Sequence, residues 1–185
     1  MNRASHLLAS GTLLIGLAVP AQAQTPTGLT ADLLKATSDV EQKLVGLANA
    51  LSTGQYDWRP GEGVRSVSEV LLHVAADNYF LPTFIGVPAP AATKVTAGDY
   101  ATVQAYERQK LDRAATIAEL TASFDHLKKA MAQVPESRMN ENIKVFGSDY
   151  TVRAFLLLAT THLHEHLGQM IAYARSNGVT PPWSR

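Results

Sequence analysis

The sequence predicts an all-α protein built as an antiparallel four-helix bundle. Four stretches carry apolar residues at the spacing of an amphipathic helix, and helix-capping or helix-breaking residues mark their ends. The connections between them are short to moderate, which suits helices that pack against their neighbours along the chain. The chain has 185 residues, of which 46% are hydrophobic, enough to bury one core.

We set residues 1–23 apart as a secretory signal peptide and expect a single helical domain over residues 24–185. An early arginine, an apolar run from Leu13 to Val19, and the small residues Ala21 and Ala23 follow the order of such a signal. The run is shorter than the roughly 20 residues of a membrane-spanning helix. We therefore expect cleavage after Ala23, export to a periplasm and no membrane contact afterwards. A retained N-terminal anchor is the alternative.

The first predicted helix covers residues 29–52. Its apolar positions recur at helical spacing, Thr30 is placed to cap its N-terminus, and Gly54 is expected to end it. A loop rich in glycine follows and carries one large aromatic residue, Trp58. This stretch therefore supplies one amphipathic helix and a well-marked break.

The second predicted helix starts after Ser66. Glu69 stands three residues later, so the pair fits a capping box in which each side chain bonds the other residue's backbone N–H. The helical pattern continues through Pro82, which lies near the end of the helix. An irregular segment rich in Pro and Ala follows it.

A long polar helical region is predicted from about Tyr100, with its best periodicity over residues 115–134 and Pro135 closing it. The segment 136–150 lacks helical periodicity and is expected to form a short extended turn. The last helix is predicted from Val152, capped by Thr151, to Asn177, and Gly178 stops it.

Charge and cysteine content exclude some function classes. Lys and Arg together number 16, as do Asp and Glu, so the basic surface typical of nucleic-acid binding is missing and we expect no nucleic-acid partner. A chain with no Cys is indifferent to an oxidising compartment.

The stretch "THLHEHLGQM" (161–170) concentrates titratable residues on an otherwise apolar helix. At about 100° per residue, His166 lies about 40° from His162, whereas His164 lies about 200° away. His162 and His166 can therefore point at one spot, and His164 cannot. The zinc-protease motif HExxH fails because position 168 is Gly. The remaining HxxxH spacing is a weak metal-site signal by itself.

His73 strengthens that signal. On the second helix it shares a face with Asp77 and with the apolar residues Val70, Phe80 and Phe84. Three core-facing imidazoles from two helices of a bundle can meet, and three histidines with an open fourth position are the ligands of a catalytic zinc-type site. Three separately hydrogen-bonded histidines, with Asp77 serving His73, are the alternative.

Two motifs resemble those of the DinB-like family. "WRPGEGVRSVSEVLLHVAADNYF" (58–80) is similar to its second-helix signature, and "THLHEHLGQMIAYARSNGVTPP" (161–182) to its last-helix signature. The resemblance implies an up-down-down-up four-helix bundle, a homodimer, and one divalent ion, zinc or nickel, held by His73, His162 and His166. It also implies a metal-dependent hydrolase or thiol S-transferase. The export signal and the "LHE" between the last two histidines depart from the family's pattern.

For such a site we expect a small-molecule substrate of unknown identity and water or a thiolate in the open position. Asp77, Glu165 and Gln169 are the candidates for orienting the histidines or contacting substrate, together with Glu69. A non-catalytic metal-binding or stress-related bundle is the alternative, and a metal-free bundle that acts through its surface is a third possibility.

The last helix also has a second apolar side, formed by Leu156, Leu157, Leu167 and Ile171. This side is expected either to pack against the third helix or to form the dimer interface, with His164 near it. His126 lies among charged residues and is expected to be exposed to solvent.

Overall fold

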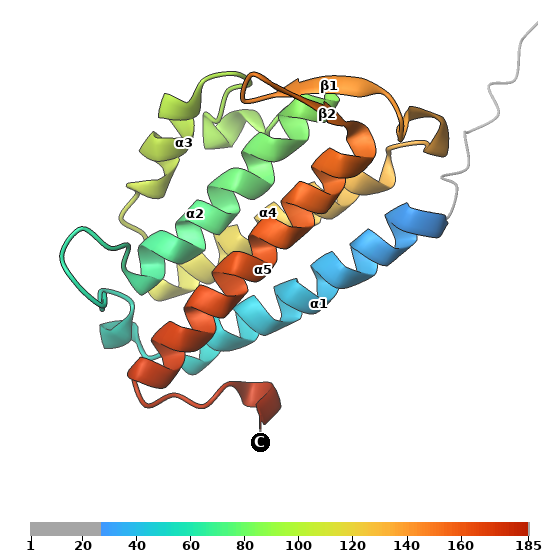
Figure 1. Cartoon of the computed structure of the whole chain (residues 1–185). Helices are drawn as coiled ribbons and strands as arrows, with labels where there is room; N and C mark the ends of the chain where they lie inside the picture. The colour runs from blue at the N-terminus through green and yellow to red at the C-terminus, as the bar shows by residue number, and fades with distance from the viewer. Residues whose placement is uncertain (1–26, 185) are drawn as a thin grey trace, which may run out of the picture.

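The computed structural model describes residues 27–184, in which four long helices form one bundle (Figure 1). They are α1 (Gly28–Ala50), α2 (Val67–Phe80), α4 (Arg113–Ala132) and α5 (Val152–Ser176). Figure 1 shows α1 and α5 running in one direction and α2 and α4 in the other, so the order is up-down-down-up. α1 packs against α4 and α5, and α2 packs against the same two helices. The predicted all-α four-helix bundle is confirmed.

α1 starts and ends earlier than predicted. Thr27 is its N-terminal flanking residue, and Thr30, the predicted cap, is buried in the first turn. The helix ends at Ala50, and Gly54 lies in a separate 3-10 turn, Thr53–Gln55. The apolar stripe of α1 faces the common core, which explains why the helix itself was predictable although its ends were not.

α2 begins with the predicted capping box. The Ser66 N–H donates to Glu69 Oε2 at 2.8 Å, and the Glu69 N–H donates to Ser66 Oγ at 3.3 Å. The helix ends at Phe80, and a 3-10 turn, Leu81–Ile85, carries the chain through Pro82. Every residue of α2 except the two in its first turn, Ser68 and Glu69, is buried. α2 is thus the most buried helix, and its buried polar residues meet other side chains, as Asn78 does by donating to Ser123 Oγ.

The region predicted as one long polar helix is two helices. α3 (Tyr100–Glu107) is an eight-residue helix that packs against α2, and Asp112 caps the start of α4 by accepting the Ala115 N–H at 2.8 Å. A side chain that caps a new helix N-terminus favours a break at that point. The single long helix was therefore wrong, and the break turns α3 back along the bundle.

A two-stranded antiparallel hairpin, β1 (Asn142–Val145) and β2 (Ser148–Thr151), precedes α5. Val145 pairs with Ser148, so Phe146 and Gly147 form a two-residue turn, and both have positive φ angles, 49° and 82°. The extended turn predicted for this segment is confirmed. Thr151 then caps α5 by accepting the Ala154 N–H at 3.2 Å, as predicted.

The two ends of the chain are described only in part. The predicted signal peptide, residues 1–23, lies outside the described residues. Within residues 27–184, no helix is both long enough and apolar enough to cross a membrane. On the second apolar side of α5, Leu156 and Leu167 are buried in the core, whereas Leu157 is 44% exposed. Intramolecular packing accounts for the first two, and the homodimer stays a prediction.

Candidate metal centre

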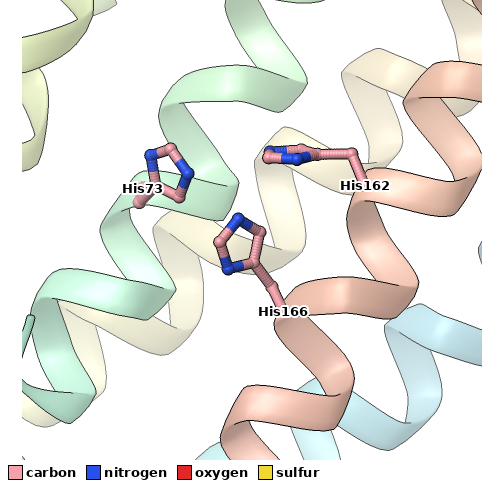
Figure 2. Close-up of side chains that lie close together, drawn as sticks. All are labelled: His73, His162 and His166. Atoms are coloured by element: carbon pink, nitrogen blue, oxygen red, sulfur yellow. The ribbon is translucent and has the colours of Figure 1, made fainter.

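His73, His162 and His166 come together in the middle of the bundle. His73 comes from the middle of α2, and the other two stand one turn apart on α5, with the three rings pointing toward one another (Figure 2). One ring nitrogen of each lies within 4.8 Å of those of the other two. The ring centroid of His166 lies 4.5 Å from that of His73 and 4.5 Å from that of His162. Such a separation lets one ion contact all three rings.

A chain of hydrogen bonds fixes the tautomer of His166. The Tyr173 hydroxyl donates to the Arg65 carbonyl at 3.0 Å, so it accepts a hydrogen bond from the Gln169 amide nitrogen at 3.0 Å. The Gln169 oxygen therefore faces His166 Nδ1, at 2.9 Å, and that nitrogen carries the hydrogen. Nε2 of His166 is left with a free lone pair. We call this chain, from Arg65 to His166, the His166 relay.

His166 Nε2 is the atom that tests whether a metal fits. It is buried and has no hydrogen-bond partner among the described residues. Burial lowers the pKa of His166 to about 4, so the ring is neutral near pH 7. A buried acceptor without a partner costs free energy, and a metal ion at the centre of the three rings would satisfy it. The donor set therefore fits a divalent ion.

Glu107 fixes the tautomer of His73 in the same way as the His166 relay fixes that of His166, with the hydrogen on Nδ1. Its Oε1 lies 2.6 Å from His73 Nδ1, and its Oε2 accepts from Arg65 at 3.1 Å. Burial alone would raise the pKa of Glu107, but the hydrogen bonds and charges of His73 and Arg65 outweigh it and lower the pKa. The carboxylate can only accept, so His73 Nδ1 carries a hydrogen. A carboxylate behind a metal-binding histidine is a common arrangement.

Asp77 faces the centre of the cluster. Its Oδ2 lies 2.8 Å from His162 Nε2 and 3.3 Å from His73 Nε2, and the residue is 7% exposed. Burial alone would lower the pKa of His162, but the hydrogen bond to Asp77 outweighs it and raises the pKa. Asp77 is therefore beside the nitrogens that would bind an ion, where a carboxylate can ligate the ion or accept a proton.

The remaining predicted site residues divide into two groups. Gln169 contacts the cluster through His166. The Glu165 side chain is 76% exposed and 3.8 Å from His162 Nδ1, and Glu69 serves the start of α2 and not the histidines. His164 is exposed and bonds the Thr160 carbonyl, so it faces away from the cluster as predicted.

Two residues were not anticipated. Glu107 was missed because it lies on α3, whose packing against α2 no periodicity revealed. His126 was expected in solvent, but it is half-buried with its ring 5.5 Å from that of Tyr79. Burial lowers the pKa of His126. Its Nε2 has no partner among the described residues.

A cavity of about 550 Å³ opens beside the histidines. His73, Asp77 and His162 form its polar end. The rest of its wall is apolar and is formed by Leu81, Tyr100, Phe146 and Leu158. Its volume is in the range of small-molecule binding sites. The histidine cluster is thus reachable by a small molecule.

Three solved structures are similar to this chain in fold. YjoA, a DinB-like protein of Bacillus subtilis, is 21% identical, with a TM-score of 0.60 over 80% of this chain and 93% of its own. A DinB-like protein of Bacillus cereus is 14% identical, with a TM-score of 0.67 over 82% of this chain and 95% of its own. YfiT of Bacillus subtilis is 14% identical, with a TM-score of 0.63 over 88% of this chain and 95% of its own. YfiT is described as a probable metal-dependent hydrolase with an unusual four-helix bundle topology. A comparison with curated proteins gives no match.

The family itself is shown by a match in sequence. The model of the DinB superfamily matches residues 36–170, more than half of the 185-residue chain. That span includes all three clustered histidines, Asp77 and Glu107. The resemblance carried by the two sequence motifs is confirmed: the chain belongs to the DinB superfamily.

Proposed function

We propose that the protein is a metal-dependent hydrolase that binds one divalent ion through His73, His162 and His166. The observation that carries this proposal is His166 Nε2, a buried nitrogen with a free lone pair and no partner among the described residues. The His166 relay orients that lone pair without contributing a ligand itself. The description of YfiT as a probable metal-dependent hydrolase supports the same reading.

Zinc or nickel is the ion proposed. Imidazole nitrogens suit both metals, and three histidines leave room for a further ligand. When bound, such an ion supplies Lewis-acid activation of a water molecule or a thiol. A thiol S-transferase would use the same ligands, so the S-transferase is the second form of this proposal.

The other residues have distinct roles in this proposal. Glu107 and Gln169 hold the rings of His73 and His166 by their Nδ1 atoms. Asp77 is buried and lies at the polar end of the cavity, where it can accept a proton from an attacking nucleophile. The cavity supplies the substrate with a site that is in contact with both Asp77 and two of the histidines.

The place of action and the assembly are proposals as well. The signal-like residues 1–23 support export to a periplasm, followed by cleavage after Ala23. Leu157, exposed on α5, supports a homodimer that uses this side of the helix.

Metal analysis tests the proposal directly. Protein purified without a polyhistidine tag is expected to hold about one divalent ion per chain. His162→Ala is expected to lose that ion, whereas His164→Ala, which removes a histidine of the same helix outside the cluster, should keep it. Hydrolysis of ester and amide substrates should disappear in His73→Ala. A negligible metal content in the wild type, no different from that of His162→Ala, would refute the proposal. Full metal content without hydrolysis of any substrate would instead favour the alternative function, a non-catalytic metal-binding protein.

A further inference from the structure

A second cavity lies on a different side of α2 from the histidines. Its volume is about 410 Å³, which is in the range of small-molecule binding sites. The described residues that line it, from α2, the end of α3 and α4, are all different from those that line the histidine cavity. Tyr79, which lines the second cavity, is six residues from His73 on α2, so the two side chains point about 120° apart around the helix.

Tyr79 brings a hydroxyl without a partner to this wall. The residue is only 4% exposed. The other buried tyrosines, Tyr56, Tyr106 and Tyr173, each donate a hydrogen bond to an oxygen atom. The Tyr79 hydroxyl has no such partner among the described residues. Burial, together with the negative charge of Glu119, raises the pKa of Tyr79 to about 12, so the hydroxyl stays protonated. A buried hydroxyl without a partner costs free energy that a bound ligand can recover.

Glu119 places a negative charge at the same end of the cavity. Its Oε2 accepts from the Tyr106 hydroxyl at 2.5 Å, and within the described residues it forms no ion pair. The other carboxylate of the wall, Asp125, lies 3.3 Å from Lys128 Nζ. Lys129 is the one Lys or Arg among the described residues of the wall, and it is ten residues from Glu119, or about 15 Å along α4. The charge of Glu119 is therefore not neutralised by the protein.

Aromatic rings border this end of the cavity. The ring centroid of Tyr79 lies 5.8 Å from that of Tyr106 and 5.5 Å from that of His126. Burial, and secondarily the charge of Lys129, lower the pKa of His126, so its ring adds no positive charge near pH 7. Neutral aromatic rings beside a carboxylate suit an organic cation.

We propose that the second cavity binds the ammonium group of a small organic amine between the Tyr79 hydroxyl and the Glu119 carboxylate. An ammonium group has three N–H donors; the carboxylate accepts one and supplies the opposite charge, and the hydroxyl oxygen accepts another. The apolar part of the amine packs against the aromatic rings. Neither the metal ion nor hydrolysis enters this inference, so it stands apart from the proposed function.

A matched pair of ligands tests the inference. 2-Phenylethylamine and 2-phenylethanol share one carbon skeleton and differ in that the first carries an ammonium group and the second a hydroxyl. Binding is followed by the shifts of backbone amide signals in NMR titrations of the protein as purified, with the metal that it holds. The amine is expected to bind about tenfold or more tightly than the alcohol, with its largest shifts at Tyr79 and along residues 119–126 of α4.

Three substitutions separate amine binding from folding. Tyr79→Phe keeps the ring and removes a hydroxyl that bonds no described residue, so the melting temperature should stay that of wild type while amine affinity falls about tenfold. Glu119→Gln should also lower amine affinity about tenfold and leave the affinity for 2-phenylethanol unchanged. Glu107→Gln removes a half-buried carboxylate that faces the histidines instead, and its amine affinity should stay within about twofold of wild type.

Three results would overturn the inference. The first is 2-phenylethanol binding as tightly as the amine, or no binding of either, because the charge of Glu119 would then select nothing. The second is an amine affinity that neither Tyr79→Phe nor Glu119→Gln changes. The third is an affinity that these two variants keep and Asp77→Asn loses, which would place the amine in the histidine cavity.

Discussion

Glu107→Gln is the substitution that most directly tests how the site is built. It keeps the shape of the side chain but removes the negative charge that lies 2.6 Å from His73 Nδ1. Bonds of this charge-assisted kind are about twice as strong as neutral ones. Loss of the partner behind a metal-binding histidine typically weakens metal affinity by about 10- to 100-fold.

The lower end of that range applies to Gln, because its amide oxygen can still accept from His73 Nδ1. We therefore expect zinc affinity to fall about tenfold, which corresponds to about 1.4 kcal/mol. The lost ion pair with Arg65 adds little to stability, because the Arg65 side chain is 41% exposed. Competition with a chromophoric zinc chelator, on protein first dialysed against EDTA, measures the affinity.

Glu119→Gln is the matched control. Glu119 is also half-buried and also accepts a short hydrogen bond, at 2.5 Å from the Tyr106 hydroxyl, but it contacts none of the three histidines. The zinc affinity of the Glu119→Gln protein should match that of wild type. If Glu107→Gln also binds zinc within about twofold of wild type, Glu107 does not support a metal-bound His73 and the reasoning fails.

Four further predictions concern the same elements. Tyr173→Phe breaks the His166 relay and should lower the zinc affinity. It should also lower the free energy of unfolding by about 1–3 kcal/mol, since the Arg65 carbonyl loses its donor. A zinc affinity and a free energy of unfolding both equal to those of wild type would contradict this prediction. Zinc at about 100 times its Kd should stabilise the wild type by about 2.7 kcal/mol in thermal unfolding and His166→Ala by far less. Ser66→Ala should cost about 1 kcal/mol in urea unfolding because it removes a helix cap. The hydrogen bond from the Ser66 N–H lowers the pKa of Glu69 below its ordinary value of 4.5. The stability that this carboxylate adds above its unfolded pKa is therefore lost as the pH falls through the folded pKa. Glu69→Gln should flatten the fall in stability below pH 4.5, and an unchanged slope would argue against it.

The fold and half of the candidate site follow from local sequence patterns. Ser66 with Glu69 and Thr151 mark helix starts that the structure reproduces. The period of 3.6 residues places His162 and His166 on one face, and the structure brings them to the same centre as His73. Each of these inferences uses residues within a few positions of one another, where helix geometry alone decides which side chains meet.

Glu107 and Phe146 could not be predicted in the same way. Glu107 reaches His73 only because α3 breaks from α4 and packs against α2, and no Gly or Pro between residues 108 and 111 signals that break. Phe146 precedes a glycine in a turn whose favoured residue at that position is Asn, so local propensity argues against the observed conformation. At Phe146 the ring's contacts with Phe84 and Tyr100 accompany a backbone conformation that local propensity disfavours. The position of Glu107 depends instead on how α3 packs on α2, which local periodicity does not encode.

The topology of the bundle explains why α3 carries so much of the site. α2 and α4 run in the same direction, so the chain between them must return along the length of the bundle (Figure 1). α3 is the helical part of this return, and its two ends have different uses: Tyr100, its first residue, lines the cavity, and Glu107, its last, holds His73. A bundle whose consecutive helices alternate in direction needs only short loops and would have no such segment. The crossover required by the up-down-down-up order thus supplies both a wall for the ligand and an anchor for one of the three histidines.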